Sequence, residues 1–324
     1  MIEISVTAPI YNEEENIELF CGKMHEAMSA LGRSYEVILV DDGSTDRSWA
    51  VMVEMARKYP HIRLLRFGRN FGQTAAISAG FRESKGKIVI TVDADLQNDP
   101  ADIPKLLARM GEGFDVVSGW RRHRKDPFLS RRLPSIMANA LISRITGVWL
   151  HDYGCTLKAY RRDVVKNVHL YGEMHRFIPA LARWVGASIA EVEVGHHPRR
   201  FGKSKYGMSR TVRVILDLVT VKFLMDYSKG PIQMFGKIGL IFAVPGVVVL
   251  LALVLGNILY WTAGILPVAV ELAKRPFWIV TPFMLIIFGT QFISIGLLAE
   301  ILIRTYHESQ DKPIYVIKET VEPR

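Results

Sequence analysis

The chain contains very little cysteine. Its 324 residues include only Cys21 and Cys155. Two cysteines cannot build a disulfide framework or a cluster of metal-binding thiolates, and so low a count fits a reducing compartment. Internal repeats and low-complexity segments are also absent from the sequence. At this length the chain can hold one large domain or two smaller ones.

Charge is missing from two long stretches near the C-terminus. No charged residue occurs from Ile238 to Val270 or from Pro276 to Ala299. About 20 apolar residues are enough to span a bilayer. The sequence therefore predicts two transmembrane helices, at about residues 236–260 and 277–301. A buried core helix is the alternative, but such a helix rarely runs so far without a charge.

The N-terminus lacks the features of a secretory signal. Its strand-like start is too short for an apolar signal segment, and acidic residues follow closely. We therefore expect the first 230 residues to stay in the cytosol. Lys222 and Lys229 precede the first span and Arg304 follows the second, in agreement with the positive-inside rule. Lys274 and Arg275, between the spans, weaken this bias without reversing it.

Positive charge is in excess. The net charge of +9 indicates an anionic partner, which can be nucleic acid, an anionic lipid or a phosphorylated substrate. Nucleic acid is the least expected of these once two membrane spans are predicted. Basic residues gather in residues 121–132 and again in residues 196–206. A charge run is usually a solvated face, but Arg and Lys beside small residues also bind phosphate.

Strands and helices alternate through the first 120 residues. This alternation predicts an α/β fold, a mostly parallel sheet with helices on both faces, whose ligands bind beyond the carboxyl ends of the strands. The expected strands are residues 3–10, 36–40, 62–67, 87–92 and 115–118. The expected helices are residues 12–31, 46–59, one beginning near 72, 101–111 and, further on, 133–146.

Polar turns follow three of these strands at the edge where ligands bind. They are Asn12-Glu13, Asp41-Asp42 and Asp93-Ala94-Asp95. Independent helix caps would explain each turn, but not the presence of all three at one edge. Residues two apart in an extended chain point the same way, so Asp93 and Asp95 can face one ligand. Hard oxygen donors of this kind suit Mg²⁺ or Mn²⁺, and the sequence predicts such a site here.

Residues 209–229 have the pattern of one or two amphipathic helices. They are expected to lie in the membrane interface; the alternative is a soluble helix packed on the preceding domain. Four parts are therefore predicted: a cytosolic domain over residues 1–208, juxtamembrane helices over 209–233, a two-helix membrane hairpin over 234–304 and a cytosolic tail over 305–324.

Taken together, the motifs resemble those of family 2 glycosyltransferases with the GT-A (Rossmann-like) fold. The similarity is to the branch that loads sugars onto polyprenyl phosphates, and it extends over nearly the whole chain. This branch includes dolichol-phosphate mannose synthases, bacterial polyprenyl-phosphate glucosyltransferases and undecaprenyl-phosphate arabinose transferases. Each motif is modest alone, but their order and spacing are specific. They are Pro9-Ile-Tyr-Asn-Glu13, Val40-Asp-Asp-Gly-Ser44, Arg69-Asn-Phe-Gly-Gln73, Asp93-Ala-Asp-Leu-Gln97, Asp152-Tyr-Gly-Cys155 and Arg200-Phe-Gly-Lys-Ser-Lys-Tyr206.

The resemblance implies roles for individual residues. The nucleotide would be held by Pro9, Tyr11, Glu13, Asp42 and Asp93. A Mg²⁺ or Mn²⁺ ion on the donor diphosphate would be held by Asp93, Asp95 and Gln97, and Asp95 and Asp152 would be the catalytic residues. Phosphate groups of the donor or acceptor would meet Arg121, Arg131, Arg200, Ser204 and Lys205.

The implied reaction is inverting transfer of a sugar from a UDP-sugar to undecaprenyl or another polyprenyl phosphate. The Asp152–Cys155 motif is shared with the arabinose branch, which favours a donor of the 4-amino-4-deoxy-L-arabinose type over a mannose donor. The acceptor phosphate has a second pKa near 6, so it is largely dianionic in the cytosol and a strong general base is nearly dispensable. Asp152 is then expected to orient the acceptor or the metal site.

Two alternatives remain open. Processive polysaccharide synthases share the donor site but carry Gln-x-x-Arg-Trp, and here Ala180 stands in place of that Gln before Arg183-Trp184. A non-catalytic membrane scaffold that binds nucleotide sugars is the other, although both metal carboxylates are present. The resemblance further implies the bacterial inner membrane, contact with anionic lipid and a possible homotetramer.

Overall fold

The computed structural model of the protein describes residues 2–122, 133–168, 170, 172, 174–198, 218, 221–222, 231–265, 271–272, 274–309 and 317–322. The chain divides into two compact units. One contains residues 1–225 together with residues 313–324, and the other contains residues 226–312. We describe each unit by itself.

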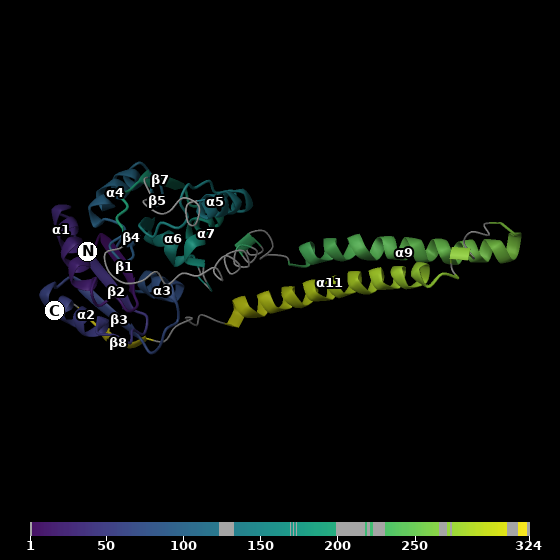
Figure 1. Cartoon of the computed structure of the whole chain (residues 1–324), viewed down its shortest axis with the longest axis horizontal. Coiled ribbons are helices and arrows are strands. Elements are labelled where there is room, and N and C mark those ends of the chain that lie inside the picture. The colour runs from purple at the N-terminus through teal and green to yellow at the C-terminus, as the bar shows by residue number, and fades with distance from the viewer. Residues whose placement is uncertain are drawn as a thin grey trace. The chain divides into compact units, whose positions relative to one another are not determined.

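The first unit is built on an eight-stranded sheet with the order β7-β5-β6-β4-β1-β2-β3-β8 (Figure 1). Its strands are β1 (Ile4–Ile10), β2 (Tyr35–Asp41), β3 (Ile62–Phe67), β4 (Ile88–Thr91), β5 (Val116–Trp120), β6 (Lys158–Arg161), β7 (Ile189–Glu193) and β8 (Ile317–Val321). The pairs β1–β2, β1–β4, β2–β3 and β5–β7 are parallel, whereas β6 and β8 run antiparallel to their neighbours. The predicted mostly parallel α/β sheet is confirmed.

Helices cover both faces of the sheet. They are α1 (Ile17–Ala30), α2 (Ser48–Lys58), α3 (Gln73–Glu83), α4 (Ile103–Gly111), α5 (Leu133–Thr146), α6 (Arg162–Lys166) and α7 (Ile178–Trp184). Successive side chains of a strand point to opposite faces. On β2, Val37 and Leu39 therefore pack in a core with α1 and α4, while Ile38 and Val40 pack against α3 on the other side.

The first helix begins later than the sequence suggested. We expected Asn12 to cap a helix, but α1 starts at Ile17. Asn12 has φ 52° and its side-chain oxygen accepts the N–H of Thr45 at 2.8 Å. A contact 33 residues away along the chain thus replaces the local cap, and residues 11–16 become a loop at the carboxyl edge of the sheet.

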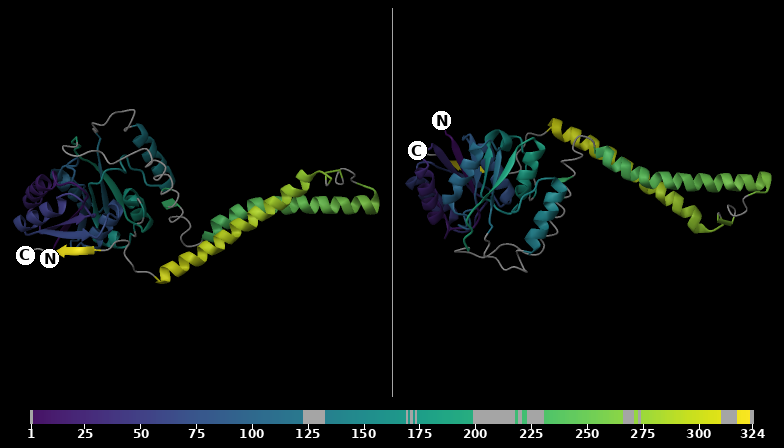
Figure 2. Two further views of the ribbon diagram at one scale, coloured as in Figure 1. Left: turned by 60° about the horizontal axis from the view of Figure 1, so that its bottom comes forward. Right: turned by 90° about the horizontal axis from the view of Figure 1, so that it is seen from above.

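The C-terminal residues return to the sheet. β8 pairs antiparallel with β3 and closes that edge, whereas a polar tail had been expected there. Arg63 of β3 is only 3% exposed and donates to Glu322 at 2.8 Å and to Glu36 at 3.2 Å. Figure 2 shows β8 lying beside the strands formed by the N-terminal part of the chain.

The second unit consists of two long helices packed side by side, α9 (Pro231–Ala263) and α11 (Pro276–Ser309). Ile232–Ala263 and Pro276–Ala299 are long and apolar enough to cross a membrane, and only 17% of each most apolar window is buried. Core helices of a soluble domain are mostly buried, so this low burial favours the predicted membrane spans. Gly239 and Gly289 let the helices approach closely, because a Cβ on Gly239 would lie 2.6 Å from the carbonyl oxygen of Gly289.

Most of the predicted juxtamembrane segment lies outside the described residues. Of residues 209–229 the structure describes Leu218, Val221 and Lys222. Leu218 and Val221 are buried in a core cluster of the first unit, so these two residues pack on that domain. Lys222 is exposed.

Candidate functional site

The turn after β4 carries the predicted metal-binding carboxylates. Asp93 is half-buried and Asp95 is buried. One oxygen of Asp95 accepts the N–H of Gln97 at 3.1 Å, and Leu96 between them has φ 60°, a conformation that is costly for a side chain of its size. Gln73, at the start of α3, donates its side-chain amide to Asp93 at 2.8 Å. The turn is thus held in a specific, strained shape, as is common at functional sites.

The charges of this turn repel one another. Burial, followed by the neighbouring Asp95 carboxylate, raises the pKa of Asp93 to about 7, against the opposing influence of Thr156, Arg121 and Lys158. Among the described residues, no group of three or more His, Cys, Asp or Glu side chains could enclose a metal. Two carboxylates with open positions fit a cation such as Mg²⁺ or Mn²⁺, which takes few protein ligands and completes its shell with water and phosphate oxygens.

Asp152 is bound to Arg121. The two carboxylate oxygens accept hydrogen bonds from Nε of Arg121 at 2.7 Å and from Nη2 at 3.0 Å, and the backbone N–H of Gly154 donates to Asp152 at 3.1 Å. Both side chains are buried. Asp152 raises the already high pKa of Arg121 still further against the effect of burial, so this cation is permanent. The resemblance gave Arg121 a phosphate-binding role within a basic run of the kind that is usually solvated, and the structure places its side chain in the interior beside Asp152.

A second buried cation lies in the same region. Lys158, the first residue of β6, is only 3% exposed, and its ammonium donates to the carbonyl oxygens of Tyr153 and Cys155. Burial lowers its pKa, while Asp152 and Asp93 oppose that effect. Residues 151–157 form a loop that we call the acceptor-side loop, because the sequence led us to expect Asp152 to orient the acceptor. This loop also contacts the Asp93 turn, because Asn98 donates to the Thr156 hydroxyl at 3.0 Å.

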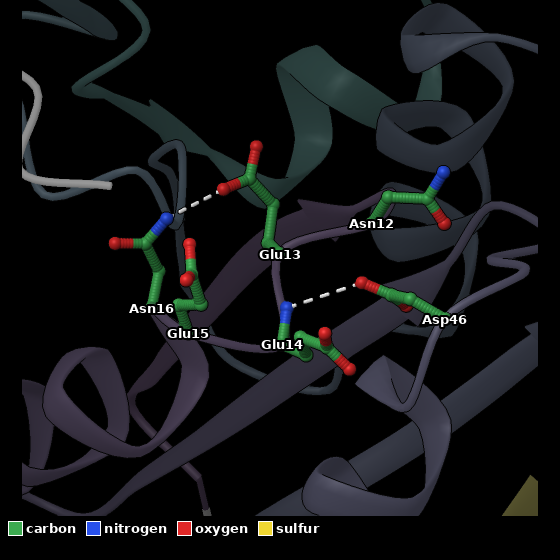
Figure 3. A pocket seen from close by; sticks show the side chains of 6 residues that line it. All are labelled: Asn12, Glu13, Glu14, Glu15, Asn16 and Asp46. Atoms are coloured by element: carbon green, nitrogen blue, oxygen red, sulfur yellow. Dashed lines mark hydrogen bonds between the residues drawn. The ribbon is translucent and has the colours of Figure 1, made fainter. Parts of the chain in front are cut away.

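An acidic pocket lies beyond β1 and β2. Its volume is about 270 Å³, and it is lined by Asn12, Glu13, Glu14, Glu15, Asn16 and Asp46 (Figure 3). Asn16 donates to the Glu13 carboxylate at 2.6 Å, and the backbone N–H of Glu13 donates to Ser48 at 2.9 Å. Carboxylates in a pocket of this kind can accept hydrogen bonds from hydroxyl and N–H groups of a ligand.

Asp42, which follows β2, holds the backbone just before α3. Its two oxygens accept the backbone N–H groups of Phe71 at 2.7 Å and Gly72 at 3.0 Å, next to Gln73. Burial raises the pKa of Asp42 to about 6, although these two hydrogen bonds oppose the rise. Asp42 therefore fixes the backbone at the start of α3. Gln73, the first residue of α3, in turn holds the Asp93 carboxylate.

Residues 5–168 match the sequence model of the family described as Glycosyl transferase family 2. The chain is also 43% identical to the dodecaprenyl-phosphate galacturonate synthase of Rhizobium johnstonii over 331 residues, which cover 98% of this chain and 93% of that protein. This protein belongs to glycosyltransferase family 2. The family suggested by the sequence motifs is confirmed.

Solved structures agree with this glycosyltransferase in fold. The glucosyl-3-phosphoglycerate synthase of Mycobacterium tuberculosis, in complex with Mn²⁺, UDP and glucosyl-3-phosphoglycerate, has a TM-score of 0.54 at 19% identity, covering 69% of this chain and 80% of that one. TarS of S. aureus, residues 1–349 in complex with UDP-GlcNAc, has a TM-score of 0.50 at 20% identity, covering 69% of this chain and 67% of that one. At such identity the likeness shows the fold alone.

Only some of the predicted site residues are among those that the structure describes. Pro9 and Tyr11 are half-buried at the carboxyl edge of β1, and Gln97 is half-buried in the Asp93 turn. Arg131, Arg200, Ser204 and Lys205 lie outside the described residues. The segment that leads to the last three is attached to the turn, since the backbone N–H of His197 donates to the Gln97 carbonyl at 2.9 Å.

Three residues near Asp93 had been given no role from the sequence. Gln73 donates a hydrogen bond to Asp93, and Thr156 and Lys158, at the start of β6, both act to lower the pKa of Asp93. Gln73 had been quoted within a motif but given no role. Lys158 lies between Leu157 and Ala159, a pattern that is typical of a strand with its polar side chains exposed, so the local sequence carries no signal of its burial.

Proposed function

We propose that the protein transfers a sugar from a UDP-sugar to a polyprenyl phosphate, with inversion, at a membrane surface. The observation that carries the proposal is the combination of the Asp93–Asp95 turn with two helices able to span a bilayer. The 43% identical relative is named for a dodecaprenyl phosphate acceptor, and the M. tuberculosis and S. aureus structures contain uridine nucleotides. Both substrates of the proposed reaction therefore have a precedent among similar proteins.

The donor would lie along the carboxyl edge of the sheet. The acidic pocket at Glu13 and the neighbouring Asp42 turn would take the nucleoside, and Asp93 and Asp95 would hold Mg²⁺ or Mn²⁺ beside the diphosphate. A divalent ion there, when bound, stabilises the charge that builds on the leaving diphosphate. Gln73 fixes the orientation of Asp93, and Arg121, oriented by Asp152, would donate hydrogen bonds on the acceptor side.

The nucleophile would be an oxygen of the acceptor phosphate. It attacks the anomeric carbon, a new carbon–oxygen bond forms, and the bond to the diphosphate breaks so that UDP leaves with the electron pair. A phosphate monoester is largely dianionic at neutral pH, so the step needs no proton transfer. Asp152 fits this scheme as a positioning residue, because both of its oxygens already accept hydrogen bonds from Arg121.

The chain topology supports a hairpin anchor. Strands from the N-terminal part and β8 from the C-terminal end belong to one sheet, so the two ends of residues 226–312 must emerge on one side of any membrane that the helices cross. We propose that this side is the cytosol and the membrane is the bacterial inner membrane. The possible homotetramer and the contact with anionic lipid remain part of this proposal.

One experiment tests the function and identifies the donor. The purified full chain is incubated with undecaprenyl phosphate and a panel of nucleotide sugars. UDP-galacturonic acid is included because of the relative, and UDP-4-amino-4-deoxy-L-arabinose and its formyl derivative because of the Asp152–Cys155 motif. We expect one UDP-sugar to give a lipid product carrying one sugar. A growing polysaccharide would instead support the processive alternative, and binding without transfer would support a scaffold.

A further inference from the structure

An apolar surface is exposed on α5 and just beyond its end. The exposed fractions are 54% for Ile136, 66% for Met137, 45% for Leu141 and 76% for Trp149. Among the described residues of the first unit, only Trp184 and Val185 are other large hydrophobic residues with comparable exposure. Contiguous exposed apolar side chains of this kind mark an interaction site.

The exposure belongs to one face of a well-packed helix. Positions 136, 137, 140, 141 and 144 fall on one side of an α-helix and are all exposed. The opposite side is buried, with Ile142 in a core cluster and the Thr146 hydroxyl 3.1 Å from that of Tyr153. The helix is therefore fixed to the domain by its inner face, and its outer face is available to meet a partner.

We propose that this outer face of α5, together with Trp149, docks into the interfacial layer of the lipid bilayer. Three observations favour lipid over a second copy of the chain. The face carries a cation, the exposed Arg144, and the basic run of residues 121–132 precedes the helix directly in the sequence. Tryptophan is enriched at membrane interfaces, and cations beside apolar side chains suit anionic headgroups. The same chain contains two helices able to span the bilayer.

Docking of α5 would fix the depth of the acceptor-side loop relative to the lipid headgroups. Asn139 on α5 donates to the His151 carbonyl at 2.7 Å, and Tyr153 donates to the Val148 carbonyl at 2.6 Å. Between these contacts lies Asp152, which holds Arg121. A helix seated among headgroups would thus present this buried cation near the phosphates of the lipid. This consequence rests on the proposed function, whereas the docking itself does not.

A fluorescent label can test the docking without catalysis. Cys21 and Cys155 are both buried, and burial raises the pKa of these thiols to about 12 and about 11, so an introduced exposed cysteine reacts selectively. Met137→Cys and Glu54→Cys are each labelled with an environment-sensitive dye in the full chain. Glu54 is exposed on α2, whose buried residues belong to a different core cluster from those of α5. Both proteins are reconstituted in phosphatidylglycerol-containing vesicles with lipid carrying a nitroxide near its headgroup.

We expect the nitroxide lipid to quench the label at position 137 by about twofold or more and the label at position 54 hardly at all, as for a side chain inserted among headgroups. Quenching should weaken in vesicles of zwitterionic lipid alone. Equal quenching at the two positions, or none at position 137, would overturn the proposal. Two results together would overturn the proposal in favour of a subunit interface. The label at position 137 would be shielded from lipid, and the unlabelled Met137→Cys variant would form a crosslink between two chains.

A kinetic comparison separates docking from the chemistry. The double variant Ile136→Ser/Leu141→Ser changes only exposed side chains, and Trp184→Ser removes an exposed tryptophan on α7 as the matched control. In vesicles we expect the double variant to raise the KM for long-chain acceptor about tenfold, while kcat with a short, detergent-soluble acceptor is unchanged. Equal effects of the double variant and Trp184→Ser would contradict a specific role for α5. If no variant, nor the wild type, transfers sugar, the proposed function fails while the quenching result still decides the docking.

Discussion

Asp152 holds the guanidinium of Arg121 with both carboxylate oxygens, at 2.7 and 3.0 Å, and both side chains are shielded from solvent. A base that removes a proton needs a lone pair directed at its substrate. In Asp152 the oxygens are directed at Arg121 and at the N–H of Gly154. Asp152 therefore orients the guanidinium of a residue 31 positions earlier in the chain, in an ion pair that has no net charge.

Removing either partner of this pair should be costly, because it leaves the other charge buried alone. We expect Asp152→Asn and Arg121→Met each to lower the free energy of unfolding by about 3–5 kcal/mol. The double variant should lose much less than the sum of the two. Denaturant unfolding of the full chain in detergent measures the three values, and additive losses would show that the two side chains do not act as a pair.

Gly43 lies where two loops of the donor side meet. It has φ 69°, and a Cβ there would come within 2.6 Å of the backbone nitrogen of Asn70. Gly32 has a similar φ of 62° but open space around it, so it is a matched control. We expect Gly32→Ala to cost about 1 kcal/mol from backbone strain alone, and Gly43→Ala to cost more. Calorimetric titration with UDP should show weaker binding for Gly43→Ala only. If both variants bind UDP equally well, Gly43 does not contribute to the proposed donor site.

The C-terminal strand should stabilise the domain through Glu322. Glu322 directly follows β8, and its carboxylate lies 2.8 Å from the buried Arg63, whereas Glu319 within β8 lies 3.9 Å from the half-buried Arg66. Replacing Glu322 by Gln leaves Arg63 with one charged partner fewer, so we expect a loss of about 1–2 kcal/mol against less than about 0.5 kcal/mol for Glu319→Gln. Thermal unfolding of the two variants decides the point, and the reverse order of stabilities would contradict it.

His61 should make the protein less stable in mild acid. Burial, followed by the nearby His25, lowers the pKa of His61 from 6.5 to about 4. Between these two values the unfolded chain binds a proton that the folded protein does not, so stability falls as the pH is lowered through this range. The slope from this residue is at most about 1.4 kcal/mol per pH unit. Thermal unfolding of His61→Gln should show a smaller loss of stability between pH 6.5 and 4 than the wild type shows. An unchanged slope of stability against pH would mean that other groups cause the acid sensitivity.

Local pattern was enough to predict the centre of the fold. Alternating strands and helices placed β1 to β4 and their neighbours correctly, and the parallel pairing follows from the connections between them. It also predicted that the turns after β1, β2 and β4 share an edge. What sequence could not supply were contacts between distant residues, such as Asn12 with Thr45 or Gln73 with Asp93.

The same limit explains the features that were missed. Residues 317–321 are a short polar segment by themselves and become a strand only because β3 offers an open edge. Arg121 belongs to a run of basic residues, and such runs normally lie at the surface. Its side chain is buried here because it forms an ion pair with the buried carboxylate of Asp152. In each case a tertiary partner, rather than the local sequence, decides the environment of the residue.

The central claim is that a metal held by Asp93 and Asp95 supports attack by a lipid phosphate on the anomeric carbon of a UDP-sugar. The most direct measurement follows a donor labelled in both sugar and uridine, with undecaprenyl phosphate and the purified full chain. The account predicts one UDP released for each lipid monophosphate sugar formed, loss of both products in EDTA, rescue by Mn²⁺ or Mg²⁺, and no rescue in Asp95→Asn. Release of UMP with a lipid diphosphate sugar, or full activity of Asp95→Asn in EDTA, would contradict it.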